Sequence, residues 1–382
     1  MTATEIESSW RPDLKRVVER HQAWFEGNHR YLVTIIPDSW DSFNWDLSID
    51  VKTPRPLETF DFFDDAQLQE HLSFRLAQFE SFWRTKAEWG LDDDFIPVFE
   101  PRIGWAEHAA ATVAGAEVGF YAQTSAMHPV IEDYNTFNWD RIRYDATSPW
   151  GQILTKANRW AARQGRGHFL VQPRALDANP SDFAKACRGS DFFLDLSLQP
   201  DQVHRLMERC TQAVIDLIED QRRVVGGEIL GGYATTWHGG YWTPGPVLGH
   251  IGDNVTDLVS GPMAAEFLAP YLRTFLGHFG GGIFARDVTT KQVWTLLRDF
   301  GNVLAFKPRN VGNVRLTAQD ISDIAIATDR LPLFLEAFSW EEFCAFRQAV
   351  VQSDVRAFFV VHCQGRDQGA RVIDDVRRLE RR

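Results

Sequence analysis

The sequence predicts an α/β protein, namely a (β/α)8 barrel of the TIM type with an N-terminal helical cap. Two patterns lead to this prediction: from residue 94 onwards the chain holds eight short apolar runs, and amphipathic helical segments lie between them. Strands that alternate with helices form parallel sheets, and eight such units favour a closed barrel over an open, doubly wound sheet. The 382 residues, 44% of them hydrophobic, suffice for one large domain.

The first 93 residues predict a helical cap that contains one strand. Apolar residues recur at helical spacing in 10–25 and again in 65–83, and the β-branched run YLVTIIP (31–37) lies between these segments. We therefore assign residues 1–93 to a cap packed on the barrel. Residues 94–382 form the predicted barrel, with an insertion around 102–165.

The eight apolar runs are the predicted strands of the barrel. They cover 94–101, 168–176, 232–237, 254–259, 281–287, 302–308, 331–338 and 357–365. Among the helices between them, 203–218 has one continuous apolar face. Residues 340–351 begin with the capping-box pair Ser339 and Glu342, and in 262–278 we expect a kink at Pro270.

Composition and charge argue against several classes of function. The net charge is −12, and the segment 41–100, with 14 acidic and 5 basic residues, contributes −9 of it. Nucleic-acid binding needs a positive face, so we expect no nucleic-acid partner. No apolar run approaches the ~20 residues that span a bilayer, no signal core opens the chain, and the four cysteines form no Cys-x-x-Cys pair. We therefore expect a cytoplasmic protein without a membrane partner.

The stretch HFGGGIFARD (278–287) combines a glycine triplet with a charged end. A phosphate-binding loop has its glycines after a strand and before a helix, whereas Gly280, Gly281 and Gly282 follow a predicted helix and precede a predicted strand. The triplet therefore indicates a helix stop and a tight turn. The strand that follows would present Arg286 and Asp287 at its far end.

Polar residues gather where the predicted strands end, which is where barrel enzymes place their reactive groups. We expect Arg286, Asp287 and Asp253 to be catalytic, with the aspartates handling protons. The residues expected to bind a small anionic organic substrate are Arg102, Arg174, Trp237, His238, Tyr241, Trp242, Asn254, Lys307 and Arg309. In the alternative interpretation, these charges pair with one another and close the barrel's rim.

Four stretches resemble the uroporphyrinogen decarboxylase superfamily: DDDFIPVFEPRIGW, ACRGSDFFLDLSLQPDQVHRLMERC, GDNVTDLVSGPMAAEFLAPYLRTF and HFGGGIFARD. The resemblance is diffuse and covers roughly residues 94–381. It implies a divergent member with a (β/α)8 barrel whose cleft lies at the carboxyl ends of the strands. Members are often dimeric, so the resemblance also suggests a homodimer.

The chain departs from the motifs of both characterised branches of this superfamily. Nothing in residues 1–60 matches the arginine-rich motif of the decarboxylase. The zinc methyltransferases carry His-x-Cys after the glycine turn, where this chain has Phe284 to Asp287. Only Cys363, beside His362, matches their cysteine on the last strand. The metal-ligand candidates are therefore Cys363 and His362, and we expect no cofactor, with zinc as the alternative.

Three functions follow from these observations. The leading hypothesis is a cofactor-independent decarboxylase of a carboxylated aromatic or heterocyclic, tetrapyrrole-like substrate. Arg286 would hold the departing carboxylate with help from Arg102, and Asp253 or Asp287 would stabilise a ring-nitrogen cation or protonate the carbanion. The alternative is a methyltransferase of the zinc/corrinoid branch, with Cys363, His362 and Asp287 as a reduced metal site. The third is a non-catalytic barrel that binds a small molecule through the aromatic loop 237–246.

Overall fold

The computed structural model describes residues 8–38, 54–103, 107–121, 125–173, 178–236, 239–311 and 313–381. Arg174, Trp237 and His238, three of the predicted substrate-binding residues, lie outside these ranges. No helix in the described ranges is long and apolar enough to cross a membrane.

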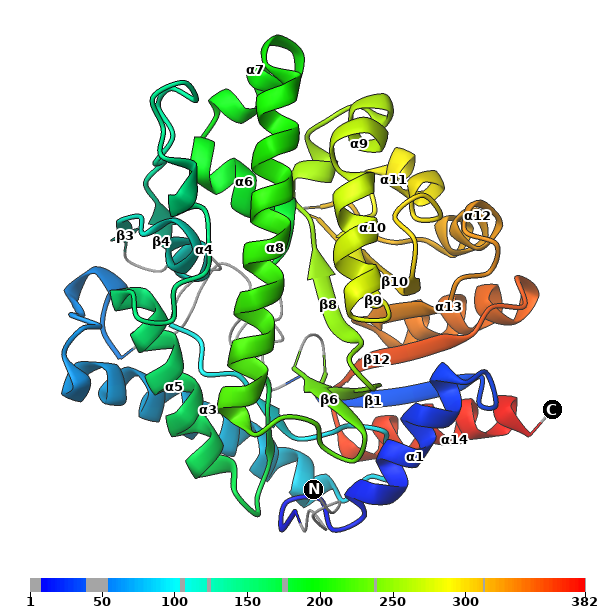
Figure 1. The fold of residues 1–382 in the computed structure, drawn as a ribbon. Coiled ribbons are helices and arrows are strands. Elements are labelled where there is room, and N and C mark those ends of the chain that lie inside the picture. The colour runs from blue at the N-terminus through cyan, green and yellow to red at the C-terminus, as the bar shows by residue number, and fades with distance from the viewer. Residues whose placement is uncertain are drawn as a thin grey trace.

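A six-stranded parallel sheet lies at the centre of the molecule, which confirms the predicted α/β class. Its order is β1-β12-β11-β10-β9-β8, and neighbouring strands are parallel throughout. In Figure 1 the N-terminal β1 lies beside the C-terminal β12. The strands are β1 (Tyr31–Pro37), β8 (Leu248–Gly252), β9 (Gly282–Asp287), β10 (Val303–Arg309), β11 (Leu333–Ala337) and β12 (Ala357–Cys363).

Two smaller sheets fill the space between β1 and β8. β2 (Val98–Phe99) pairs in parallel with β5 (Leu170–Val171), and β6 (Gly232–Thr235) forms an antiparallel hairpin with β7 (Tyr241–Pro244). The Asp94 N–H donates to Val33 O on β1 at 2.7 Å, and the Thr236 N–H donates to Gln172 Oε1 at 2.6 Å. The hairpin also packs beside β8. Among the described residues, the hydrogen bonds between paired strands do not form a closed barrel.

Three strand predictions differ from the structure, and one of them is 232–237, which forms β6 of an antiparallel hairpin rather than a parallel barrel strand. Residues 31–37 are a strand, as predicted, but that strand belongs to the main sheet, so the segment 1–93 contributes more than a cap. Residues 254–259 are not a strand: the strand is β8, and Val255–Asp257 is a 3-10 helix, η3. Asp253 Oδ1 accepts a hydrogen bond from the Thr256 N–H at 3.1 Å. This local bond favours a turn and overrides the strand preference of the β-branched residues.

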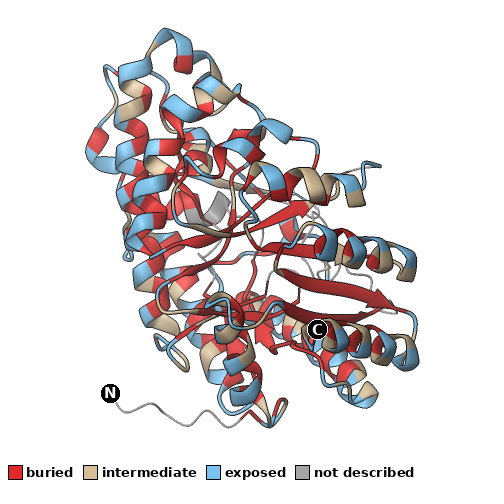
Figure 2. Ribbon diagram, turned by 90° about the vertical axis from the view of Figure 1, so that its right-hand side faces the viewer, coloured by how far each residue is buried: buried red, intermediate tan, exposed pale blue. Residues whose placement is uncertain are grey.

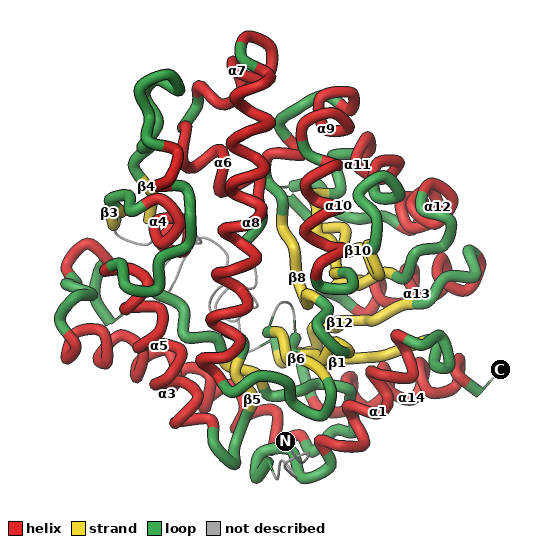
Figure 3. Tube along the Cα trace, in the orientation of Figure 1, coloured by secondary structure: helices red, strands yellow, loops and turns green. Residues whose placement is uncertain are grey.

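Helices cover the outside of the sheet, as Figure 3 shows. In Figure 2 the strands are buried almost throughout, whereas the helices are buried on one side and exposed on the other. The helices are α1 (Leu14–Phe25), α3 (Asp65–Trp89), α4 (Glu107–Ala114), α5 (Pro149–Gly165), α6 (Pro180–Arg188), α7 (Asp191–Leu198), α8 (Pro200–Val225), α9 (Gly261–Phe267), α10 (Ala269–His278), α11 (Lys291–Leu296), α12 (Ala318–Ala327), α13 (Trp340–Gln352) and α14 (Arg366–Glu380). Two 3-10 helices (η1 Leu57–Thr59, η2 Trp139–Arg141) and the hairpin β3 (Val118–Phe120)–β4 (Ser125–Met127) complete the described elements.

Local sequence signals set several helix boundaries. Ser339 Oγ accepts from the Glu342 N–H at the start of α13, as the capping pattern predicts. The predicted helix 262–278 breaks at Leu268 into α9 and α10, with Pro270 in the first turn of α10. A proline in the first helical turn loses no intrahelical bond, which explains why the break precedes it.

The amino ends of the strands are closed by an apolar cluster. Leu32, Ile283, Ala305, Phe334 and Phe358 come from five strands and pack together with Trp24 of α1 and Tyr241 of β7. Successive residues of a strand face opposite sides, so the neighbours of these residues face the covering helices. Among the described residues, this cluster closes the inner side of the sheet at the amino ends of the strands.

Candidate active site at the carboxyl ends of the strands

Three adjacent strands bring together a buried polar group on the inner face of the sheet. Glu336 of β11 lies between Lys307 of β10 and His362 of β12: its carboxylate is 3.7 Å from Lys307 Nζ and 3.0 Å from His362 Nε2. The Lys307 and His362 side chains are each only 3% exposed. The three residues have the same strand parity as the inner apolar residues Ala305, Phe334 and Phe358. They therefore face the interior, and they lie nearer to the carboxyl ends of the strands than those apolar residues do.

Lys307 has unused capacity to bind an anion. Its ammonium makes no hydrogen bond to another described residue, and its ion pair with Glu336 is long. A buried ammonium without hydrogen bonds is costly unless a ligand or water supplies the acceptor. The arrangement therefore favours an anionic group beside Lys307.

A second ion pair lies near this group at the ends of β9 and β10. Arg309 Nη2 and Nε both donate to Asp287 Oδ1, at 2.7 and 3.1 Å, and each side chain is about a quarter exposed. Asp287 has the same parity as the inner residue Ile283. The structure thus brings Asp287, Lys307, Arg309 and His362 of the predicted set to one opening.

The position of Arg286 argues against its expected catalytic role. It alternates with the inward-facing Asp287, and its side chain is 0% exposed. Its guanidinium pairs with Asp257 at 2.9 Å and donates to Asn254 Oδ1 and to the Asp253 carbonyl. A fully enclosed guanidinium with these partners cannot hold a departing carboxylate in the interior. These contacts hold the loop after β8 against β9, and Asn254 is one of the loop residues involved.

Asp253 belongs to this loop cluster rather than to the inner group. It is fully buried, and its Oδ2 makes no hydrogen bond within the described chain. Asp182 at the start of α6 accepts from the backbone and side-chain nitrogens of Asn254 and from Asn179 Nδ2. Burial, and next the charge of Asp253, raise the pKa of Asp182 to about 7. Sequence reasoning missed Asp182, because only the fold brings α6 to the end of β8.

Three other predicted substrate-binding residues are structural. Tyr241 lies in the apolar cluster that closes the interior, and its hydroxyl donates to Gly249 O. Trp242 packs against α1 and donates to Ile229 O at 2.9 Å. Arg102 is 1% exposed, and its guanidinium lies 3.4 Å from the Glu100 carboxylate. Tyr241 and Trp242 are therefore enclosed by apolar neighbours, which argues against their predicted role in substrate binding.

The two predicted metal ligands cannot bind one ion together. His362 and Cys363 are consecutive on β12, so they face opposite sides of the sheet. Cys363 is fully buried, and burial raises the pKa of its thiol to about 12. No group of three or more His, Cys, Asp or Glu side chains in the described ranges is arranged to hold a metal ion.

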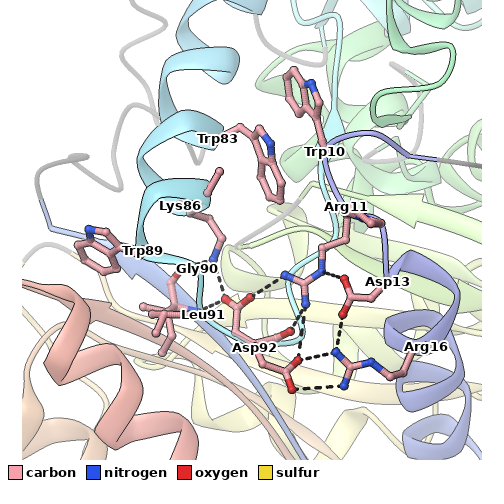
Figure 4. A pocket seen from close by; sticks show the side chains of 14 residues that line it. Trp10, Arg11, Asp13, Arg16, Trp83, Lys86, Trp89, Gly90, Leu91 and Asp92 are labelled. Atoms are coloured by element: carbon pink, nitrogen blue, oxygen red, sulfur yellow. Dashed lines mark hydrogen bonds and ion pairs between the residues drawn. The ribbon is translucent and has the colours of Figure 1, made fainter.

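A hollow on the outer side of β1 also contains charged residues, which Figure 4 shows. Lys86 Nζ donates to Asp93 Oδ2 and to Ile35 O, both at 2.6 Å, and Arg11 and Arg16 pair with Asp13. These partners neutralise one another, and they join α1 and α3 to β1. We therefore assign a structural role to the ion pairs that line this hollow and do not treat it as a candidate active site.

Comparisons with known proteins show a similarity of fold. No protein-family model matches the chain, and no curated protein matches it significantly. Among solved structures, the chain is similar to a methyltransferase from Methanosarcina mazei, with a TM-score of 0.54, 11% sequence identity, and coverage of 95% of this chain and 98% of that one. The chain shares the fold of this methyltransferase. The match is consistent with a TIM-like barrel and with the resemblance described above, and at this identity it concerns the fold alone.

Proposed function

We propose that the protein is an enzyme that transfers a methyl group to or from a small anionic substrate bound at the carboxyl ends of the strands. The observation that carries the proposal is the position of Glu336 on the inner face, where its carboxylate contacts both Lys307 and His362. The full-length similarity to a methyltransferase supports the choice of reaction.

The inner residues suit such a reaction. Lys307, with Arg309 beside it on β10, would bind the anionic group of the substrate through charge-assisted hydrogen bonds. When a methyl group leaves the neutral heteroatom of an ether, amine or thioether, that atom keeps the bonding electron pair, and its negative charge is neutralised by a proton. His362, held at Nε2 by Glu336, would supply this proton, or accept it in the reverse direction. The methyl acceptor is a second substrate.

A resident zinc ion would hold a thiol acceptor as thiolate. On the inner face His362 and Glu336 are ligand-type residues, but the described chain provides no three-residue site. We therefore assign no step to a metal.

Decarboxylation is the second candidate, because one observation also fits it. The buried Lys307 ammonium, without a hydrogen bond among the described residues, offers a place for a carboxylate. His362 would then protonate the carbanion that remains after CO₂ leaves.

Product analysis separates the two reactions. The purified protein is incubated with O-, N- and S-methylated carboxylic acids together with a free thiol or cob(I)alamin, and methylated acceptors are detected by mass spectrometry. We expect methylated acceptor that is lost in Glu336→Gln and retained in the exposed control Glu266→Gln. CO₂ release from aromatic or heterocyclic acids, without any methylated acceptor, would overturn the proposal in favour of decarboxylation.

A further inference from the structure

We infer that Arg315, Phe338 and His362 form a subsite for a planar, aromatic or heteroaromatic carboxylate at the outer end of the opening. The inference rests on the proposed site, whose substrate class it specifies, but it does not depend on which reaction takes place there. Three observations carry it: a ring stack, an arginine held over the ring, and the lack of a carboxylate partner for that arginine among the described residues.

The ring stack joins the surface to the inner group. Phe338 directly follows β11, and its ring stacks on the imidazole of His362 with centroids 4.6 Å apart and planes inclined by 14°. Phe338 is 37% exposed, whereas His362 is buried and bonded to Glu336. An exposed aromatic ring beside a buried polar group is a surface that a flat ring can contact at little entropic cost.

Arg315 is placed over this ring by the loop between β10 and α12. Two backbone hydrogen bonds, at 3.1 and 2.9 Å, pair Val311 with Val314. The Leu316 N–H donates to Asn310 Oδ1 at 2.7 Å, and the Leu316 side chain is buried. These bonds fix both sides of Arg315, and its guanidinium carbon lies 5.6 Å from the centre of the Phe338 ring.

Arg315 differs from the other cations of the opening in having no carboxylate partner. Lys307 pairs with Glu336 and Arg309 with Asp287, but no carboxylate of the described residues lies within 4.0 Å of Arg315. A guanidinium presents parallel N–H groups that match a carboxylate. A planar carboxylate would therefore meet Arg315 with its charged end and Phe338 with its ring, and its remaining part would point toward His362.

Benzoate is the probe for this subsite, and its affinity is measured by isothermal titration calorimetry. We expect Arg315→Gln to weaken benzoate binding about tenfold or more, the usual effect of losing a charge-assisted bond. Arg205→Gln is the matched control: the Arg205 guanidinium carbon lies 4.2 Å from the centre of the Trp139 ring, and α8, which contains Arg205, packs mainly on α5, α6 and α10 rather than on β10, β11 or β12. It should leave benzoate affinity unchanged, and neutral benzamide should not distinguish the two variants.

Two further measurements test the ring. Phe338→Leu should weaken binding of benzoate more than binding of cyclohexanecarboxylate, which is not flat. In the wild type, benzoate should shift the His362 ring resonances in NMR spectra, assigned with the variant His362→Gln.

Equal benzoate affinity in the wild type and in Arg315→Gln, or no benzoate binding to the wild type, would overturn the inference. If Arg315-dependent binding is found but no methyl group is transferred, the proposed reaction fails and the subsite stands. If methyl groups are transferred from carboxylates and Arg315→Gln does not change that activity, the proposed reaction stands and the subsite fails.

Discussion

Replacing Asp253 with asparagine should weaken the loss of stability that Asp182 causes as the pH rises from 5 to 8. Burial and the Asp253 charge raise the pKa of Asp182 from 3.8 to about 7. The folded protein therefore holds a proton that the unfolded chain releases above pH 3.8. The contribution of Asp182 to stability is then largest below pH 3.8, falls as the pH rises, and levels off above pH 7.

The pKa difference sets the size of the effect. A shift of about three units corresponds to about 4 kcal/mol at roughly 1.4 kcal/mol per unit. Asparagine keeps the oxygen that accepts from the Thr256 N–H, and it replaces the unbonded Oδ2 of Asp253 with an N–H donor. The like charge is lost, but the desolvation of Asp182, which is the larger cause of the shift, remains, so we expect at most about half of the pH-dependent contribution, no more than roughly 2 kcal/mol, to disappear.

The assay is urea unfolding followed by circular dichroism at pH 5, 6, 7 and 8. The control is Asp367→Asn, because the Asp367 side chain is fully exposed. The control should follow the wild-type curve at every pH, and Asp253→Asn should gain stability relative to both as the pH rises. Parallel curves for Asp253→Asn and the wild type across this pH range would refute the reasoning.

Three further predictions follow from single contacts. Glu336→Gln should leave the buried Lys307 ammonium without its counter-charge and lower the free energy of unfolding by about 3 kcal/mol, measured in urea. Gly240 has φ +59°, and a Cβ there would overlap a backbone carbonyl oxygen, so Gly240→Ala should lower the free energy of unfolding by at least about 2 kcal/mol. Gly115 has φ +63° but lies in open space, so Gly115→Ala should lower it by about 1 kcal/mol. Equal melting temperatures of the two variants would contradict this difference. Because burial raises the pKa of the Cys363 thiol to about 12, iodoacetamide at pH 8 should modify Cys363 only after urea is added, as peptide mass spectrometry can verify.

The sequence predicted the class of the fold well and the faces of its strands poorly. Apolar runs separated by amphipathic helices were enough to predict the parallel sheet and the strands that contain Arg286, Lys307 and His362. Strand alternation also carried a signal that the prediction did not use: Arg286 and Asp287 are neighbours, so they cannot both face one opening. The same reasoning separates His362 from Cys363.

The sequence by itself determined the alternation of strands with helices and, through the period of two, which residues within one strand share a face. Only the tertiary structure decided which face is the inner one, because that depends on which side the helices cover. It turned Arg286 outward and brought Glu336, a single carboxylate in an apolar strand, between Lys307 and His362. Contacts between strands that lie far apart in the chain depend on the packing of the whole sheet, and the local pattern of residues does not encode them.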